Sequence, residues 1–125
     1  MKTIINTDAA PKAIGPYSQA VMIDGFLYTS GQIAIDPATG EFVEEGIEAQ
    51  TERVLENIKA ILEAAGMDLN NVIKTTVFVT NMGDFAKINE IYGKYFKDNP
   101  PARSLVEVKS LPKGALIEIE VVARK

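Results

Sequence analysis

The last quarter of the chain contains two stretches in which apolar and polar residues alternate, and this alternation limits the fold more than any other feature. Residues 103–108 and residues 115–123 both follow it, and both are rich in β-branched side chains. A period of two is typical of half-buried strands. Residues 109–114, which include Pro112 and Gly114, are typical of a turn. The sequence therefore predicts two strands that form one wall of a core.

If the two strands form a hairpin whose loop has an even number of residues, odd positions of the first strand face even positions of the second. Arg103 and Leu105 would then share a sheet face with Glu118 and Glu120. If that face is covered, one guanidinium and two carboxylates on it must form ion pairs or serve in binding or catalysis. We therefore expect these charges to lie close together.

The rest of the chain predicts one domain, residues 1–125, with the order strands, helix, strand, helix, strands. Strands are expected over residues 3–6, 18–23, 26–33 and 72–79, with Asp24-Gly25 as a hairpin turn. Apolar residues recur at helical spacing over residues 47–65 and 85–96. Gly66 ends the first helix, and Pro100 and Pro101 forbid continuation of the second.

Two amphipathic helices can cover only one face of such a sheet. The expected composition of the other face is mixed, with Arg103, Glu118 and Glu120 beside Leu105, Leu116 and Val122. A face of this kind is too apolar for open solvent and too charged for a dry core, so we expect association through it. The alternative is a solvated face with scattered apolar side chains.

Composition excludes several kinds of chemistry. The chain of 125 residues has no cysteine and no histidine, so it has neither a thiolate nucleophile nor an imidazole base or metal ligand. It has no apolar run long enough for a transmembrane helix, and the apolar stretch at its start is too short for a signal peptide. The net charge of −4 means that the chain lacks the overall excess of positive charge that is typical of nucleic-acid-binding proteins. We expect a cytoplasmic protein without a metal site.

Six positions are candidates for chemistry, and each has a plainer interpretation. Arg103 can clamp a small carboxylate with its planar fork, or it can form a structural salt bridge with Glu118 or Glu120. Glu118 can act as a general base or orient a water molecule, and Glu120 can do the same or merely pair with a cation. Tyr17, after a rigid turn, can bond a substrate or simply pack, and Gly31, within a strand, can mark close approach to a ligand or simple crowding. Asn89 in the second helix can face either way. Taken one at a time, these signals are not specific.

Taken together, the motifs are specific. They are, in chain order, Ile14-Gly15-Pro16-Tyr17-Ser18-Gln19-Ala20, Thr29-Ser30-Gly31-Gln32-Ile33, Lys74-Thr75-Thr76-Val77-Phe78-Val79, Pro101-Ala102-Arg103-Ser104, and Leu111-Pro112-Lys113 followed by Ile117-Glu118-Ile119-Glu120. With these motifs the chain resembles the RidA/YjgF family of reactive enamine and imine deaminases over nearly its whole length.

The resemblance implies a chorismate-mutase-like α+β fold and a homotrimer with sites in the clefts between subunits. It also implies cofactor-free hydrolysis of 2-aminoacrylate and related 2-imino acids to 2-keto acids and ammonia. The family's substrate arginine falls on Arg103 and its catalytic glutamate on Glu118. The substrate-binding positions fall on Tyr17, Ser30, Gly31, Asn89 and Leu105.

Two departures from the family pattern are visible. Leu105 stands where many members have cysteine, which removes a thiol from the pocket and bears on the substrate side chain that is accepted. The segment before Pro101 is shorter than in some relatives. Two other functions stay open at this point, a regulator that binds 2-keto acids without turnover and an RNA-directed inhibitor or ribonuclease.

Overall fold

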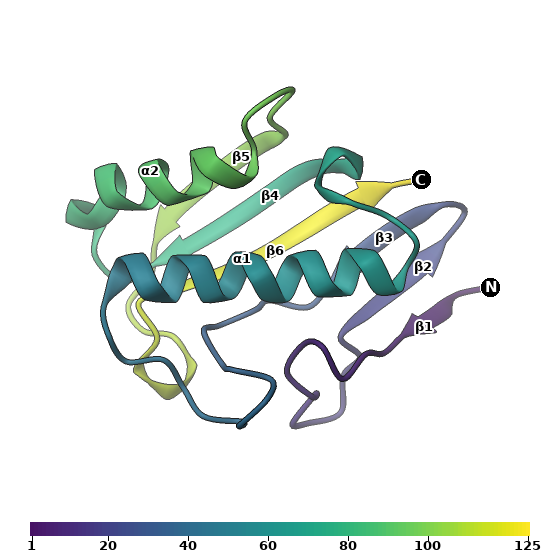
Figure 1. Ribbon diagram of the computed structural model, residues 1–125, viewed down its shortest axis with the longest axis horizontal. Coiled ribbons are helices and arrows are strands. Elements are labelled where there is room, and N and C mark those ends of the chain that lie inside the picture. Colours follow the sequence, from purple (N-terminus) through teal and green to yellow (C-terminus); the bar gives the residue numbers. More distant parts are fainter.

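The computed structural model describes residues 1–125 as a two-layer α+β domain (Figure 1). One mixed sheet has the strand order β1-β2-β3-β6-β4-β5. The strands are β1 (Thr3–Ile5), β2 (Ala20–Ile23), β3 (Phe26–Thr29), β4 (Val72–Val79), β5 (Ala102–Glu107) and β6 (Ile117–Arg124), and the helices are α1 (Ile47–Ala64) and α2 (Phe85–Tyr95). No helix combines the length and the apolar character that a membrane span needs.

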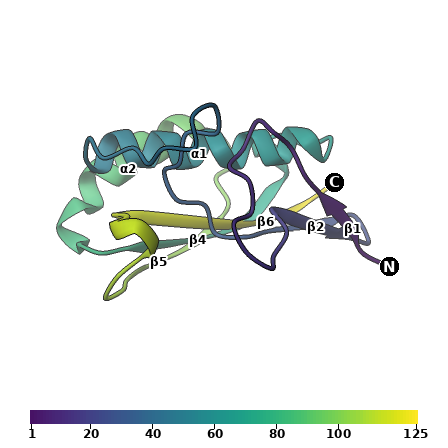
Figure 2. The same cartoon turned by 90° about the horizontal axis from the view of Figure 1, so that it is seen from below.

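Both helices lie on the same side of the sheet, as predicted (Figure 2). α1 places Val54, Ile58 and Ile61 against the sheet, all with no exposed surface. Ile117 and Ile119 of β6 are equally buried, because β6 is a central strand directly beneath this layer. The core therefore lies between the helices and one face of the sheet.

The β2–β3 hairpin confirms the prediction made from Asp24-Gly25. Ile23 pairs with Phe26 across a two-residue turn, and Asp24 and Gly25 have φ angles of 52° and 81°. Two consecutive positive φ values are the requirement of the turn type that suits the twist of a hairpin, and aspartate followed by glycine meets it. β3 is shorter than predicted, since it ends at Thr29.

The hairpin predicted for the last quarter of the chain is wrong. β4 lies between β5 and β6, pairing in parallel with β5 and antiparallel with β6. The β4–α2–β5 segment is a crossover unit, in which the helix returns the chain so that two strands run in the same direction. β6 then enters between β4 and β3. The alternation identified both strands correctly but carried no information about which strand is the neighbour.

The corrected topology moves Arg103 and Leu105 to the opposite face from the one expected. Arg103 is opposite Thr75 on β4, and Thr75 is opposite Val121, a buried residue of β6. Directly opposed residues point to the same side of a sheet. Arg103 and Leu105 therefore lie on the side of the helices, whereas Glu118 and Glu120 lie on the uncovered side.

The uncovered face of the sheet is largely apolar. Ile4, Tyr28 and Val106 are 60%, 44% and 43% exposed. They share this face with Val21, Phe78 and Val122, with Glu118 and Glu120 among them. No element of the chain covers it (Figure 2).

Candidate active site

Arg103, Asn89 and Leu105 form what we call the arginine half-site. Arg103 Nη1 donates a hydrogen bond of 2.8 Å to Asn89 Oδ1 on α2. Leu105 follows two residues later on β5 and faces the same way, half-buried. The guanidinium also lies over the Tyr92 ring, with its carbon 4.8 Å from the ring centroid. A guanidinium held at one nitrogen keeps further N–H donors for a planar acceptor such as a carboxylate.

Glu118, Gly31, Ser30 and Tyr17 form the glutamate half-site. The Glu118 side chain lies directly against Gly31: a Cβ atom added to this glycine would be 2.7 Å from the carboxyl carbon and closer still to one oxygen. Glycine at position 31 therefore makes room for the carboxylate, which is the close-approach interpretation of a glycine in a strand. Ser30 Oγ donates a 2.6 Å hydrogen bond to the carbonyl of Ser18.

An interruption of the sheet produces this geometry. Regular β3–β6 pairing ends at Tyr28, and pairing resumes at Gln32, whose backbone exchanges hydrogen bonds of 2.8 and 3.1 Å with Ile119. Between these points the Thr29 hydroxyl accepts from the Val121 N–H at 3.0 Å. Ser30 and Gly31 are thus released from the ladder beside Glu118, in the manner of a bulge.

The electrostatic environment of Glu118 suits proton transfer. Burial raises the pKa of the Glu118 carboxyl above its usual value, and the negative charge of Glu120 raises it further. A carboxylate with a raised pKa is a stronger base, closer to the optimum for catalysis near neutral pH. For Glu120 itself, on the exposed part of the same face, the structure suggests an electrostatic influence on Glu118 rather than direct chemistry.

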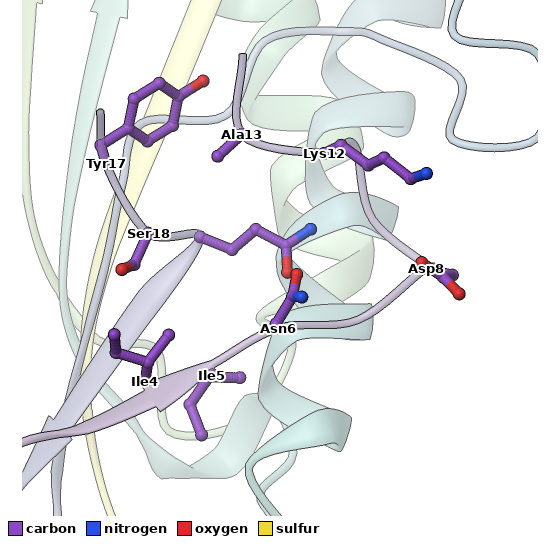
Figure 3. A pocket seen from close by; sticks show the side chains of 9 residues that line it. Ile4, Ile5, Asn6, Asp8, Lys12, Ala13, Tyr17 and Ser18 are labelled. Carbon is purple, nitrogen blue, oxygen red and sulfur yellow. The ribbon is translucent and has the colours of Figure 1, made fainter. Parts of the chain in front are cut away.

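Tyr17 belongs to the glutamate half-site because it lines the same surface hollow as Gly31. Its hydroxyl accepts a 3.3 Å hydrogen bond from the Ile14 N–H, and its side chain is 50% exposed. It borders a hollow of about 220 Å³ together with Gly31 and Gln32. A larger hollow of about 470 Å³ lies on its other side, between β1 and the loop that follows (Figure 3).

The two half-sites are separate within one chain. Arg103 and Glu118 lie on opposite faces of the sheet, with β4 between their strands. This arrangement contradicts the expectation of a shared face, and it equally contradicts a structural salt bridge between Arg103 and either glutamate. No group of three His, Cys, Asp or Glu side chains is placed to hold a metal ion.

Comparison with known proteins identifies the family. Residues 7–125 match the family model described as Endoribonuclease L-PSP. The crystal structure of RidA from the Antarctic bacterium Psychrobacter sp. has a TM-score of 0.95 and 48% identity to this chain, and the match covers 98% of this chain and 99% of that one. The chain belongs to the RidA/YjgF family.

Two further RidA/YjgF relatives show the range of names in the family. A RutC family protein of Pyrococcus horikoshii is 60% identical over 125 residues, which are 100% of this chain and 99% of the relative. The human 2-iminobutanoate/2-iminopropanoate deaminase is 50% identical over 123 residues, which are 98% of this chain and 90% of the human protein.

Three side chains that shape the two half-sites of this RidA/YjgF chain are not among the site residues predicted from the sequence. Phe85 and Tyr92 lie beside Arg103. Gln19, two residues after Tyr17, is buried, and its amide accepts from the Thr7 N–H at 2.7 Å and donates to the Pro11 carbonyl at 2.8 Å. A glutamine in a loop motif was the available signal for Gln19, and helical spacing on α2 was the signal for the two rings.

Proposed function

We propose that this protein hydrolyses reactive 2-imino and 2-enamine acids, such as 2-aminoacrylate and 2-iminopropanoate, to 2-keto acids and ammonia, as a cytoplasmic homotrimer that needs no cofactor. The observation that supports this most strongly is the pair of half-sites: a guanidinium with unused donors, and a partly buried carboxylate with a raised pKa. These are the two groups that a small, charged imino acid requires. The human relative bears the name of this activity.

In the proposed mechanism Arg103 binds the substrate carboxylate and Glu118 acts on water. Glu118 accepts a proton from the water molecule while the water oxygen bonds to the imine carbon, and the electron pair of the C=N bond moves to the nitrogen, which takes that proton back from Glu118. In the resulting carbinolamine, Glu118 takes the hydroxyl proton and passes it to the amino nitrogen, so that the C–N bond breaks, ammonia leaves and the carbon–oxygen double bond of the keto acid forms. The imine hydrolyses without help, so positioning and one proton-transfer group suffice.

We further propose that each active site lies between two copies of the chain. One chain cannot bring Arg103 and Glu118 to the same small molecule, because they lie on opposite faces of its sheet. The apolar uncovered face, with Ile4, Tyr28 and Val106, supplies a surface through which copies can associate. In the trimer, the arginine half-site of one copy meets the glutamate half-site of the next.

A coupled assay tests the proposed function. A pyridoxal-phosphate-dependent lyase generates 2-aminoacrylate, and pyruvate and ammonia release are followed with and without the protein. We expect acceleration above the spontaneous rate by the wild type and a loss of it in Glu118→Gln, with Glu120→Gln as the matched control on the same strand. Binding of 2-keto acids without any acceleration would instead support a regulator, and cleavage of RNA would support a ribonuclease.

A further inference from the structure

Helix α2 presents one stripe of side chains to Arg103. Phe85, Asn89 and Tyr92 are spaced by four and three residues, so they lie on the same face of the helix. The guanidinium carbon is 4.8 Å from the Tyr92 ring centroid and 5.7 Å from that of Phe85. Asn89 accepts a hydrogen bond from Nη1 between them along the helix. Arg103 is therefore contacted by two ring faces and one amide oxygen.

Tyr92 is the fixed member of this group. It is only 6% exposed, and its hydroxyl shares a 2.8 Å hydrogen bond with the fully buried Thr75 on β4. Its ring packs against Phe96 with a centroid distance of 4.7 Å. Burial raises the pKa of the Tyr92 phenol, so the ring stays neutral in the physiological range. The position of the ring is thus determined by the core of the protein.

Phe85 is the outer member. Its side chain is 42% exposed, although it is large and apolar and stands at the first position of α2. Core packing therefore does not explain a ring at this position. Its distance from Arg103 is within the range in which a cation is attracted to a ring face.

We propose that Tyr92 and Phe85 are positioning residues, which hold the Arg103 guanidinium so that its remaining N–H donors face the substrate carboxylate. This inference rests on the proposed function. A free arginine side chain has many rotamers, and fixing it before the substrate arrives removes an entropic cost from binding. Asn89 fixes one nitrogen, and the two rings fix the plane.

Kinetics of ring variants test this proposal. Phe85→Leu and Tyr92→Leu are expected to raise KM for 2-iminopropanoate, and Kd for 2-oxobutanoate measured by calorimetry, by roughly 3- to 10-fold while kcat stays within about twofold. Phe85→Tyr and Tyr92→Phe retain the rings and should recover KM, although Tyr92→Phe lowers Tm by leaving Thr75 without its partner.

Two controls separate positioning from packing. Tyr95→Leu removes a ring from the same helix, where the hydroxyl donates to Glu56 and the ring is not over Arg103, so KM should be unchanged. In an Arg103→Ala background, Phe85→Leu should have no further effect, because the group that it positions is gone.

The outcomes are distinct. Wild-type KM and Kd in both leucine variants, an effect that persists without Arg103, or an equal effect in Tyr95→Leu would each overturn the proposal. A wild type that binds 2-oxobutanoate but does not accelerate imine hydrolysis would refute the deaminase function, and the Kd values would still decide the role of the rings. A wild type that does neither would refute both.

Discussion

At the scale of single residues, Arg103 is bound to the protein in a way that distinguishes a substrate clamp from a structural ion pair. Its hydrogen bond goes to a neutral amide, Asn89, rather than to a carboxylate. Arg103→Ala is expected to lower kcat/KM by roughly 30- to 1000-fold, since a charge-assisted bidentate contact contributes about 2–4 kcal/mol. Arg103→Lys should recover only a small part, because lysine lacks the planar fork.

Activity and Tm should be measured on the same preparation of each Arg103 variant. A half-buried arginine at the edge of the sheet contributes little to the core, so Tm should change little. A variant that unfolds early, or one that remains fully active, contradicts the role of a clamp.

The pH dependence of activity should follow Glu118. Its pKa is raised by burial first and by Glu120 second. The carboxylate form is the base, so kcat/KM should fall as the pH drops through this raised pKa. Glu120→Gln removes the second cause, and the acid limb of the pH–rate profile should move to lower pH. An acid limb that stays in place in Glu120→Gln would show that the limb reports another group.

The raised pKa of Glu118 also makes the stability of the folded protein depend on pH. The folded protein binds the Glu118 proton more tightly than the unfolded chain does, so folded-state stability is lost as the pH rises from the unfolded to the folded pKa. Glu118→Gln is therefore expected to raise Tm at about pH 8, with a gain that shrinks as the pH falls from the folded to the unfolded pKa and is absent below it. Calorimetry at several pH values measures this, and a gain that grows on acidification contradicts it.

Gly31 tests the close approach of the backbone to Glu118. Gly31→Ala places a methyl group against the Glu118 carboxyl, so the carboxylate must move and kcat/KM should fall by at least tenfold. Gly93 is the matched control: it lies inside α2, a Cβ there meets nothing within 4 Å, and Gly93→Ala should raise stability by about 0.5–1 kcal/mol. Full activity in Gly31→Ala would show that Glu118 tolerates displacement.

The residue types of the candidate site could be predicted from the sequence, but their grouping could not. The motifs around Tyr17, Gly31, Arg103 and Glu118 made these residues candidates, and their roles stay predictions. Which of these residues lie together depends on strand order, because the neighbouring strand and its register decide which residues of two strands are on the same face of the sheet. Tyr92 could not be distinguished from an ordinary core aromatic, since its contact with Arg103 depends on the same order.

At the scale of elements, the sequence predicted both helices and most of the strands, because each has a clear period of its own. The β5–β6 hairpin failed for a physical reason: alternation reports burial of one face and says nothing about the partner strand. The crossover through α2 determines that partner. The prediction from Asp24-Gly25 was correct because a two-residue turn makes the two strands that it joins neighbours.

Asn57 connects α1 to the loop between β3 and the helix. It is fully buried, and its amide donates to the carbonyls of Ile33 at 3.3 Å and Ile35 at 3.0 Å. Asn57→Ala leaves these acceptors without partners and should lower the free energy of unfolding by roughly 2–4 kcal/mol. Denaturant titration measures the change, with the exposed Lys59→Ala on the same helix as control. A loss no larger than that of the control would mean that water replaces the amide.

At the scale of the whole molecule, the uncovered face of the sheet predicts assembly. Light scattering after size exclusion should give three times the chain mass of 13.6 kDa. Val106→Asp changes a side chain that is 43% exposed in the single chain, so it should leave the fold intact while breaking the trimer and the activity together. A stable, active monomer would contradict both the assembly and the shared site.

The central claim is that Arg103 of one copy and Glu118 of another act on the same substrate molecule, and subunit mixing tests it most directly. Arg103→Ala and Glu118→Gln chains, each expected to keep at most a few per cent of the activity alone, are co-expressed with different tags and the mixed trimers are purified. Each purified mixed trimer has one cleft of three that combines an intact Arg103 with an intact Glu118, so about a third of the wild-type activity should return. Mixed trimers as inactive as their parents would contradict the account.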